Sequence, residues 1–114
     1  SDPDVAAVAG RHAQVASFSL ALVAPIGRAA FLAGVSRVQE RFGPALLRMK
    51  GLVCFEGEAL PCEVHGVHGE LYPIRTLPQW PGDDRLSRLV YIVRGADVDA
   101  VRAQVCAALG QFPA

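Results

Sequence analysis

The sequence predicts an α+β domain, a two-layer sandwich in which two helices cover one face of a mostly antiparallel sheet of about four strands. Alternating apolar and polar residues mark the strands, and two other segments carry apolar residues at helical spacing. Each helix has a single apolar stripe, so both helices can be buried on the same sheet face. The expected order, βαβββα, has a ferredoxin-like resemblance but lacks the helix that a ferredoxin-like fold places between its third and fourth strands. The strand order within the sheet stays open.

The first strand and the first helix lie in the first 44 residues. Apolar residues alternate with serines over residues 15–23, which predicts a half-buried strand. The apolar side of this strand holds Phe18, Leu20 and Leu22. A helix is predicted after Gly27, and Gly43-Pro44 ends it. The apolar stripe of this helix holds Phe31, Val35, Val38 and Phe42.

Two further strands are expected to form a hairpin across the connection at residues 57–59. The first of them covers residues 45–56, and its core side holds Leu47, Met49, Val53 and Phe55. The second begins at Leu60, reaches His68 and extends toward residue 74. Its glycines at positions 66 and 69 indicate a bulge or a close approach of another backbone.

A loop, a strand and a helix complete the domain. Prolines, a glycine and two aspartates around Trp80 predict a polar loop, in which Asp83 and Asp84 are turn formers. Residues 86–93 then form a strongly apolar strand, and Asp97 begins the last helix as its N-cap. The apolar stripe of this helix holds Val98, Val101, Val105, Leu109 and Phe112.

Length and composition indicate one domain, residues 12–114, preceded by a tail or linker at residues 1–11. The chain has 114 residues, of which 52% are hydrophobic, and it carries 11 basic and 11 acidic residues. Zero net charge gives no general attraction to nucleic acid or to an anionic membrane. No apolar run approaches the roughly 20 residues of a membrane span. Three cysteines without a CxxC pair favour a reducing compartment, so a cytoplasmic protein is expected.

The sequence contains no recognisable catalytic arrangement. A phosphate-binding loop needs glycines and a lysine between a strand and a helix, but the only lysine, Lys50, lies inside a predicted strand. No Ser/His/Asp or Cys/His arrangement follows from the spacing either. The chain is therefore expected not to be an enzyme by itself and to hold no cofactor.

One cluster has the residue types of a zinc site. Cys62, His65 and His68 lie within seven residues. On an extended strand His65 and His68 face opposite sides, and Cys62 lies roughly 20 Å from His68 at about 3.3 Å per residue. Only a sharp bulge at Gly66 would bring the three together, so they are candidates for a metal site against the simpler interpretation of strand-surface residues.

Two other features have open interpretations. If the connection at residues 57–59 is tight, Cys54 and Cys62 lie across from each other, where they could form a disulfide, share a soft metal, or stay reduced as small apolar residues. Cys106 is expected at the core. A basic stripe is also expected on one sheet face, as a docking surface or as an ordinary solvated face balanced by acidic residues. The stripe holds Arg48, Lys50, Arg88 and Arg94, and the acidic residues are Glu56, Glu63 and Glu70.

Three segments, in order, resemble the CobW carboxy-terminal domain family. Residues 46–53 read LLRMKGLV and are similar to the family's R-x-K-G strand. Residues 64–69 read VHGVHG, and residues 87–95 read SRLVYIVRG before Asp97-Val98, similar to the family strand that leads into the last helix. His12 matches a histidine that often opens the domain. The sequence departs from the pattern at Val93, where glycine is usual, and at His65, where glutamine is common.

The resemblance implies a function for the chain as part of a larger protein. In the family this module follows a GTPase domain in metal chaperones that deliver cobalt or zinc, for example in cobalamin biosynthesis and metal homeostasis. The parent would bind GTP, magnesium, and zinc or cobalt, and this chain would be its accessory interaction domain. Expected partners are the GTPase domain, a client metalloprotein or cofactor-synthesis enzyme, and a second copy of the chain, but neither nucleic acid nor membrane.

Within that expectation, Arg48, Lys50 and Arg88 are the predicted docking residues, because they coincide with the family pattern. The alternative is a free-standing domain that binds a small molecule or a metal through the strand from His65 to His68. It would use a sheet edge to dimerise.

Overall fold

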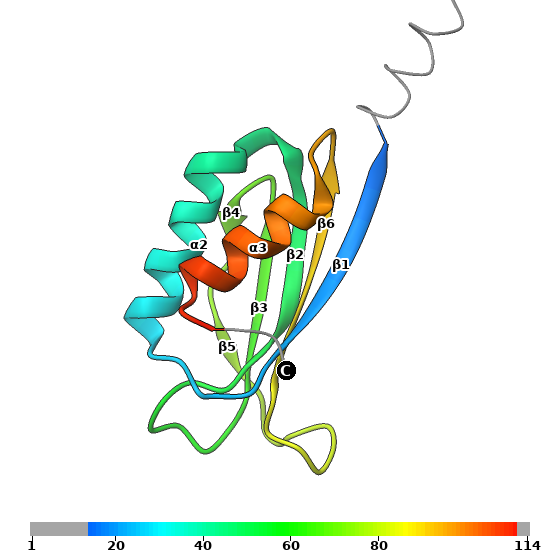
Figure 1. Ribbon diagram of the computed structural model, residues 1–114. Coiled ribbons are helices and arrows are strands. Elements are labelled where there is room, and N and C mark those ends of the chain that lie inside the picture. Colours follow the sequence, from blue (N-terminus) through cyan, green and yellow to red (C-terminus); the bar gives the residue numbers. More distant parts are fainter. Residues whose placement is uncertain (1–13, 112–114) are drawn as a thin grey trace, which may run out of the picture.

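Four long strands form the body of an antiparallel sheet. They are β1 (Val15–Leu22), β2 (Leu46–Val53), β3 (Cys62–Val67) and β6 (Ser87–Arg94). Their order across the sheet is β1-β6-β2-β3, so the last strand of the chain inserts between the first two (Figure 1). This computed structural model describes residues 14–111, and the predicted tail, His12 and Phe112 lie outside that range.

Two short strands share the free edge of β3. β4 (Glu70–Leu71) pairs with its end at Gly66 and Val67, and β5 (Arg75–Thr76) pairs with its beginning. The sheet therefore has six strands, more than the four expected. The predicted extension of the third strand toward residue 74 is wrong, because the chain reverses at His68 and Gly69, both with positive φ (48° and 82°).

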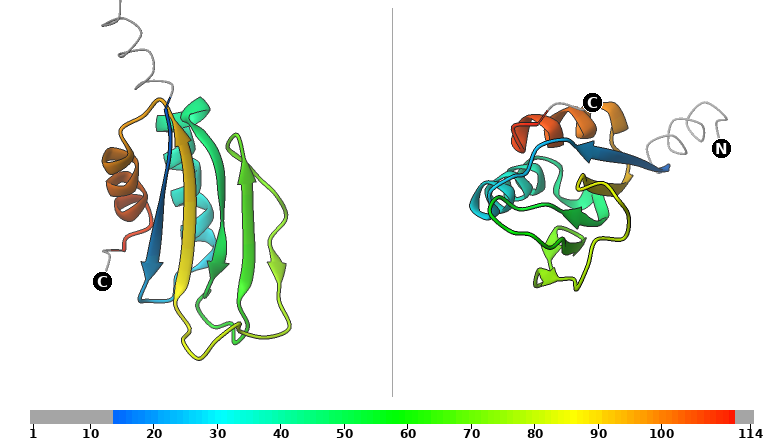
Figure 2. Two further views of the ribbon diagram at one scale, coloured as in Figure 1. Left: turned by 90° about the vertical axis from the view of Figure 1, so that its right-hand side faces the viewer. Right: turned by 90° about the horizontal axis from the view of Figure 1, so that it is seen from below.

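Both helices pack on the same face of the sheet, as the sequence predicts. α2 (Arg28–Phe42) is followed by the short 3₁₀ helix η1 (Gly43–Ala45), and α3 (Val98–Ala108) is the last element of the described chain. Figure 2 shows the helix-free face of the sheet, with α2 behind it and α3 beside the β1 edge. Asp97 caps α3 as expected, since its side chain accepts hydrogen bonds from the amides of Asp99 and Ala100.

The core lies between the helices and the sheet. The described part of the predicted apolar stripes is confirmed: Phe31 and Val38 of α2, and Val101 and Val105 of α3, are fully or almost fully buried. Cys106 is buried as well. The sheet contributes Leu20, Leu22, Met49, Val53, Cys62, Val64, Leu89, Tyr91 and Val93.

One register shift changes the predicted inner face of β2. The pairing of β2 with β6 is irregular between Leu46 and Arg48. At that point Leu46 becomes the buried residue, and Leu47, which the sequence pattern places on the core side, is only half-buried. A bulge inserts one residue into a strand and so changes which side chains face inward.

The two helices touch closely because Gly34 has no side chain. A Cβ at this position would lie 2.7 Å from the carbonyl oxygen of Ala108 in α3. The Arg37 guanidinium donates to the same carbonyl at 2.7 Å, which ties the end of α3 to the middle of α2. No helix in residues 14–111 is long and apolar enough to cross a membrane.

Gly51 fixes the spacing of the two central strands. A Cβ on this residue would lie 2.0 Å from the backbone oxygen of Arg88 in β6, a contact that only movement of the strand can relieve. We expect Gly51→Ala to lower the free energy of unfolding by about 2 kcal/mol or more. Gly82→Ala, which meets no atom within 4 Å, should change it by less than about 0.5 kcal/mol. Urea unfolding of both variants tests this, and equal stabilities would contradict it.

Candidate functional site

The helix-free face of the sheet, here called the open face, contains a hollow of about 570 Å³ over its central strands. Its basic lining residues are Arg48 and Lys50 from β2 and Arg88 from β6, here called the cationic ladder. Leu52, Leu77 and Val90 supply a half-buried apolar floor. The hollow therefore combines positive charge with aliphatic surface.

Strand register explains why residues distant in sequence meet here. Residues paired across neighbouring strands project on the same side of a sheet. Lys50 pairs with His65 on one side and Val90 on the other, and Leu52 pairs with Glu63 and Arg88. Arg48 pairs with Ile92, two residues before Arg94. The predicted common face of the basic stripe is confirmed, although Arg94 does not line the hollow.

The charges of the ladder are only partly balanced. Arg88 pairs with Asp84 at 2.9 Å, and Arg48 donates from Nε to Nε2 of His65 at 3.2 Å. Glu63, the one carboxylate among the described residues that line the hollow, pairs instead with Arg75 at 3.1 Å. Lys50 makes no ion pair within the part of the chain that the structure describes. The hollow is therefore a positively charged site open to an anionic partner.

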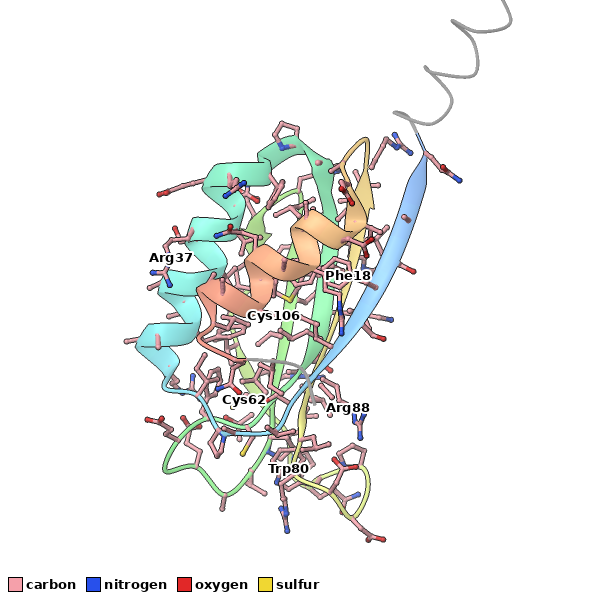
Figure 3. The ribbon with its side chains drawn as sticks, in the orientation of Figure 1. Phe18, Arg37, Cys62, Trp80, Arg88 and Cys106 are labelled. Carbon is pink, nitrogen blue, oxygen red and sulfur yellow. The ribbon has the colours of Figure 1, made fainter. Side chains whose placement is uncertain are left out.

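The loop before β6 borders this hollow. Figure 3 places Trp80 of this loop at the same end of the sheet as Arg88, and both line a second, smaller hollow of about 240 Å³. The indole of Trp80 donates to the Ala59 carbonyl at 2.8 Å, which holds the loop against the β2–β3 connection. Asp84 accepts from the Leu86 amide as well as from Arg88, and both bonds hold the pKa of its carboxyl below 3.8. Asp84 therefore helps to form the turn before β6, as the sequence predicts.

The structure does not bring the candidate metal ligands together. Cys62 is buried on the helix side, whereas His65, of opposite parity on β3, lies on the open face, and His68 lies in the turn. Gly66 pairs regularly with Met49, so no bulge shortens the distances. No group of three potential ligands occurs in residues 14–111. Cys62, His65 and His68 are too dispersed to coordinate one zinc or cobalt ion together. The function proposed below therefore does not depend on a metal site formed by them.

Cys54 and Cys62 are not bonded to each other. Both are free thiols, and the residue that pairs with Cys62 is Val53 rather than Cys54. Cys54 instead donates its amide to the buried Ser87 hydroxyl at 2.8 Å. The order and spacing of the cysteines gave no indication of this contact.

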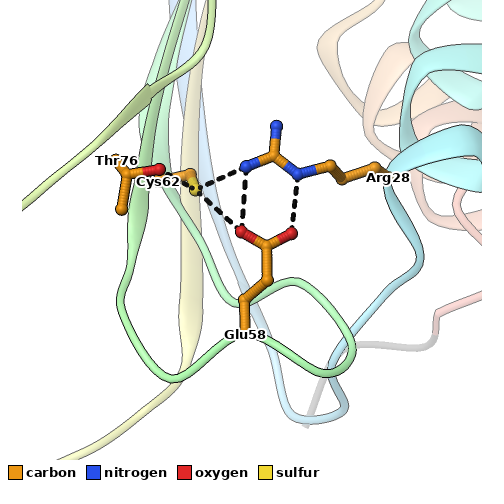
Figure 4. A network of polar contacts seen from close by, with 4 residues as sticks. All are labelled: Arg28, Glu58, Cys62 and Thr76. Atoms are coloured by element: carbon orange, nitrogen blue, oxygen red, sulfur yellow. Dashed lines mark hydrogen bonds and ion pairs between the residues drawn. The ribbon is translucent and has the colours of Figure 1, made fainter.

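A polar network between the start of α2 and the β2–β3 connection was not predicted from the sequence (Figure 4). Arg28, at the start of α2, forms a two-bond ion pair with Glu58 at 2.6 and 2.9 Å. The same guanidinium contacts the Cys62 sulfur at 3.3 Å and lies over the Phe55 ring. Positions 28 and 58 are 30 residues apart, and only the fold brings them together. The network fastens α2 to the β2–β3 connection.

A small cavity of about 20 Å³ lies between α2 and the sheet. The Tyr91 hydroxyl and Gln39 Oε1, from residues that line it, have no hydrogen-bond partner among the described residues. Burial raises the pKa of Tyr91 to about 12. The Tyr91 ring itself is well packed, stacked on Phe18 at 5.4 Å.

These features define a class of protein: an α+β domain with one sheet face buried by helices and the other left as a charged surface with a hollow. Residues 15–109 match the family model described as the cobalamin synthesis protein cobW C-terminal domain. The chain therefore belongs to this family. The comparison with curated proteins gives no match.

Two solved structures share the fold. One is a zinc-bound triple mutant of the YjiA GTPase, with a TM-score of 0.70 and 21% identity. The other is the zinc-bound YjiA GTPase from E. coli, with a TM-score of 0.62 and 25% identity. Each comparison covers 83% of this chain but only 29% of the GTPase chain. The chain thus corresponds to less than a third of those proteins.

The Arg28–Glu58 pair makes stability depend on pH. The hydrogen bonds from Arg28, together with the positive charge of Arg28, lower the pKa of Glu58 from its ordinary value of 4.5. A carboxyl with a lowered folded-state pKa stabilises the fold above its unfolded pKa, and this contribution is lost as the pH falls through the folded value. We expect Glu58→Gln to reduce the thermal midpoint at pH 7, and the difference from wild type to disappear in acid. Glu56→Gln is the control in the same connection, and an equal loss in both variants would contradict the assignment.

The Tyr91 hydroxyl should not stabilise the fold. Because it is buried without a described partner, Tyr91→Phe is expected to leave the free energy of unfolding at pH 7 unchanged or to raise it by about 1 kcal/mol. Above pH 10 unfolded tyrosine ionises, whereas buried Tyr91 keeps its proton to about pH 12. Wild type should therefore lose roughly 1 kcal/mol relative to the variant at pH 11. Urea unfolding at both pH values measures this, with exposed Tyr72→Phe as control.

Proposed function

We propose that this domain is the accessory interaction domain of a CobW-type metal-chaperone GTPase and that it packs on the GTPase domain through the open face. The observation that carries the proposal is the hollow on that face, with three basic residues, one unpaired lysine among them in residues 14–111, and an aliphatic floor. A face with this composition favours a partner that buries apolar atoms and supplies negative charge. Family membership supports a GTPase domain as that partner.

In this proposal the parent protein binds GTP with magnesium and carries zinc or cobalt as its cargo. Residues 14–111 bring no metal ligands together, and the only lysine of the chain lies in β2 rather than in a phosphate-binding loop, so nucleotide and metal are assigned to the GTPase domain. Its role is to position the GTPase domain and, together with it, to help recognise a client metalloprotein or cofactor-synthesis enzyme. Catalysis belongs to the GTPase domain.

The single lysine allows a direct test of the packing. Lys50 is the only lysine in the chain and lines the hollow. We expect an amine-acetylating reagent to modify Lys50 at least about tenfold more slowly in the full-length parent protein than in this chain, because burial excludes the reagent. Peptide mass spectrometry over a time course gives both rates.

A relocated lysine controls for general effects. In the double variant Lys50→Arg/Arg102→Lys the reactive amine lies on α3, on the helix side of the domain. Its acetylation rate should be the same in the chain and in the parent. If Lys50 of the wild-type parent reacts as fast as Lys50 of this chain, the GTPase domain does not cover the open face and the proposed packing is wrong.

A further inference from the structure

The spacing of the cationic ladder indicates which kind of ligand fits it. Lys50 lies two residues after Arg48 on β2, and Arg88 lies level with Leu52, two residues further along. Since a strand rises about 3.3 Å per residue, the three positions follow one another at roughly 6.6 Å along the strand direction, and Arg88 is displaced sideways by about 4.8 Å because it lies on the neighbouring strand. The ladder therefore repeats every two residues of an extended chain over about 13 Å.

An extended polypeptide has the same repeat. Its side chains alternate between two faces, so residues i, i+2 and i+4 project toward the same surface at the same interval of roughly 6.6 Å. Carboxylates at these three positions would meet Arg48, Lys50 and Arg88 in turn. Glutamate fits the floor as well, because its CH₂ groups can pack on Leu52 and Val90 while its carboxylate reaches a cation.

The free domain already shows a carboxylate on this ladder. Asp84, from the loop before β6, pairs with Arg88 at 2.9 Å, and both side chains are more than half exposed. An incoming carboxylate must therefore compete with Asp84 for Arg88. Lys50 is open to a ligand without such competition among residues 14–111.

Other anions fit the hollow less well. Single-stranded nucleic acid binds through aromatic rings that stack on its bases, but the described residues that line the hollow include no phenylalanine, tyrosine or tryptophan. The chain also has no net charge to attract a phosphate backbone. A single small anion would engage one or two of the three cations, whereas an extended segment can reach all of them.

We propose that the hollow binds an extended acidic segment of the GTPase domain, in which glutamates at three alternate positions pair with Arg48, Lys50 and Arg88. This inference rests on the proposed packing. It adds that the segment is acidic and that it runs along the strand axes of the sheet. Asp84 acts as a built-in competitor that weakens the interaction and can be displaced from Arg88.

Capped five-residue peptides test the register on this chain. The probe is Glu-Ser-Glu-Ser-Glu, the isomer with the same charge is Glu-Glu-Glu-Ser-Ser, and the neutral analogue is Gln-Ser-Gln-Ser-Gln. We expect the alternating peptide to bind with a dissociation constant of about 1 to 10 mM at low salt, at least about threefold tighter than its isomer. NMR titration should shift the signals of β2, β3 and β6. Equal affinity of the two acidic peptides would overturn the register.

Two variants that change affinity in opposite directions separate binding from folding defects. Lys50→Gln should weaken the alternating peptide about two- to fivefold, whereas Asp84→Asn should tighten it by a similar factor, because Arg88 is released. Asparagine keeps an oxygen for the Leu86 amide, so the loop turn is preserved. Arg102→Gln, on the helix side, should have no effect. Weaker binding of the alternating peptide to Asp84→Asn would overturn the proposal, as would equal losses of affinity in Lys50→Gln and Arg102→Gln. Tighter binding of a ten-nucleotide oligothymidylate than of the alternating peptide would also overturn it.

The two proposals fail in different ways. If Lys50 is protected in the parent protein but no acidic peptide binds, the packing holds and the acidic segment is wrong. If the peptide binds but Lys50 reacts equally fast in the parent and in this chain, the acidic-ligand site holds and its assignment to the GTPase domain is wrong.

Discussion

The insertion of β6 between β1 and β2 is the constraint on which the rest of the structure depends. β6 pairs with β1 over eight residues and with β2 over most of its length, and it joins the two ends of the chain into one sheet. Its inward side chains, Leu89, Tyr91 and Val93, lie at the centre of the core. Without this insertion neither helix would have a continuous apolar surface to cover.

The same strand links stability to the open face. Because side chains alternate along a strand, each core residue of β6 has a neighbour on the opposite side of the sheet, including Arg88 and Val90. Two helices can bury only one face, so the other must be covered by a partner or tolerate water. In the proposed function a partner covers this face, and the basic residues of the ladder keep it polar where no partner is bound. Gly51, which lets β2 and β6 approach closely, therefore supports the core and the hollow together.

Much of this arrangement follows from local patterns. Apolar spacing located both helices and the four long strands, and the common parity of Arg48 with Lys50, and of Arg88 with Arg94, placed the stripe on one face. The short strands β4 and β5 were not foreseen because two-residue strands have no periodicity to detect. The bulge near Leu47 was not predicted either, because it arises from the pairing of β2 with the neighbouring strand β6. The Arg28–Glu58 pair joins residues that no sequence spacing connects.

The sequence by itself determined the fold class, the helix stripes, the cap at Asp97 and the absence of a phosphate-binding loop, because each depends on residues that are close along the chain. Only the tertiary structure decided the strand order, the regular pairing of Gly66 that leaves Cys62 and His65 on opposite faces, and the joining of β2 with β6 that brings three basic residues to one hollow. The physical reason is that strand pairing is chosen by the burial of the whole core. Short-range patterns specify which side of a strand is apolar, but not which strand will lie beside it.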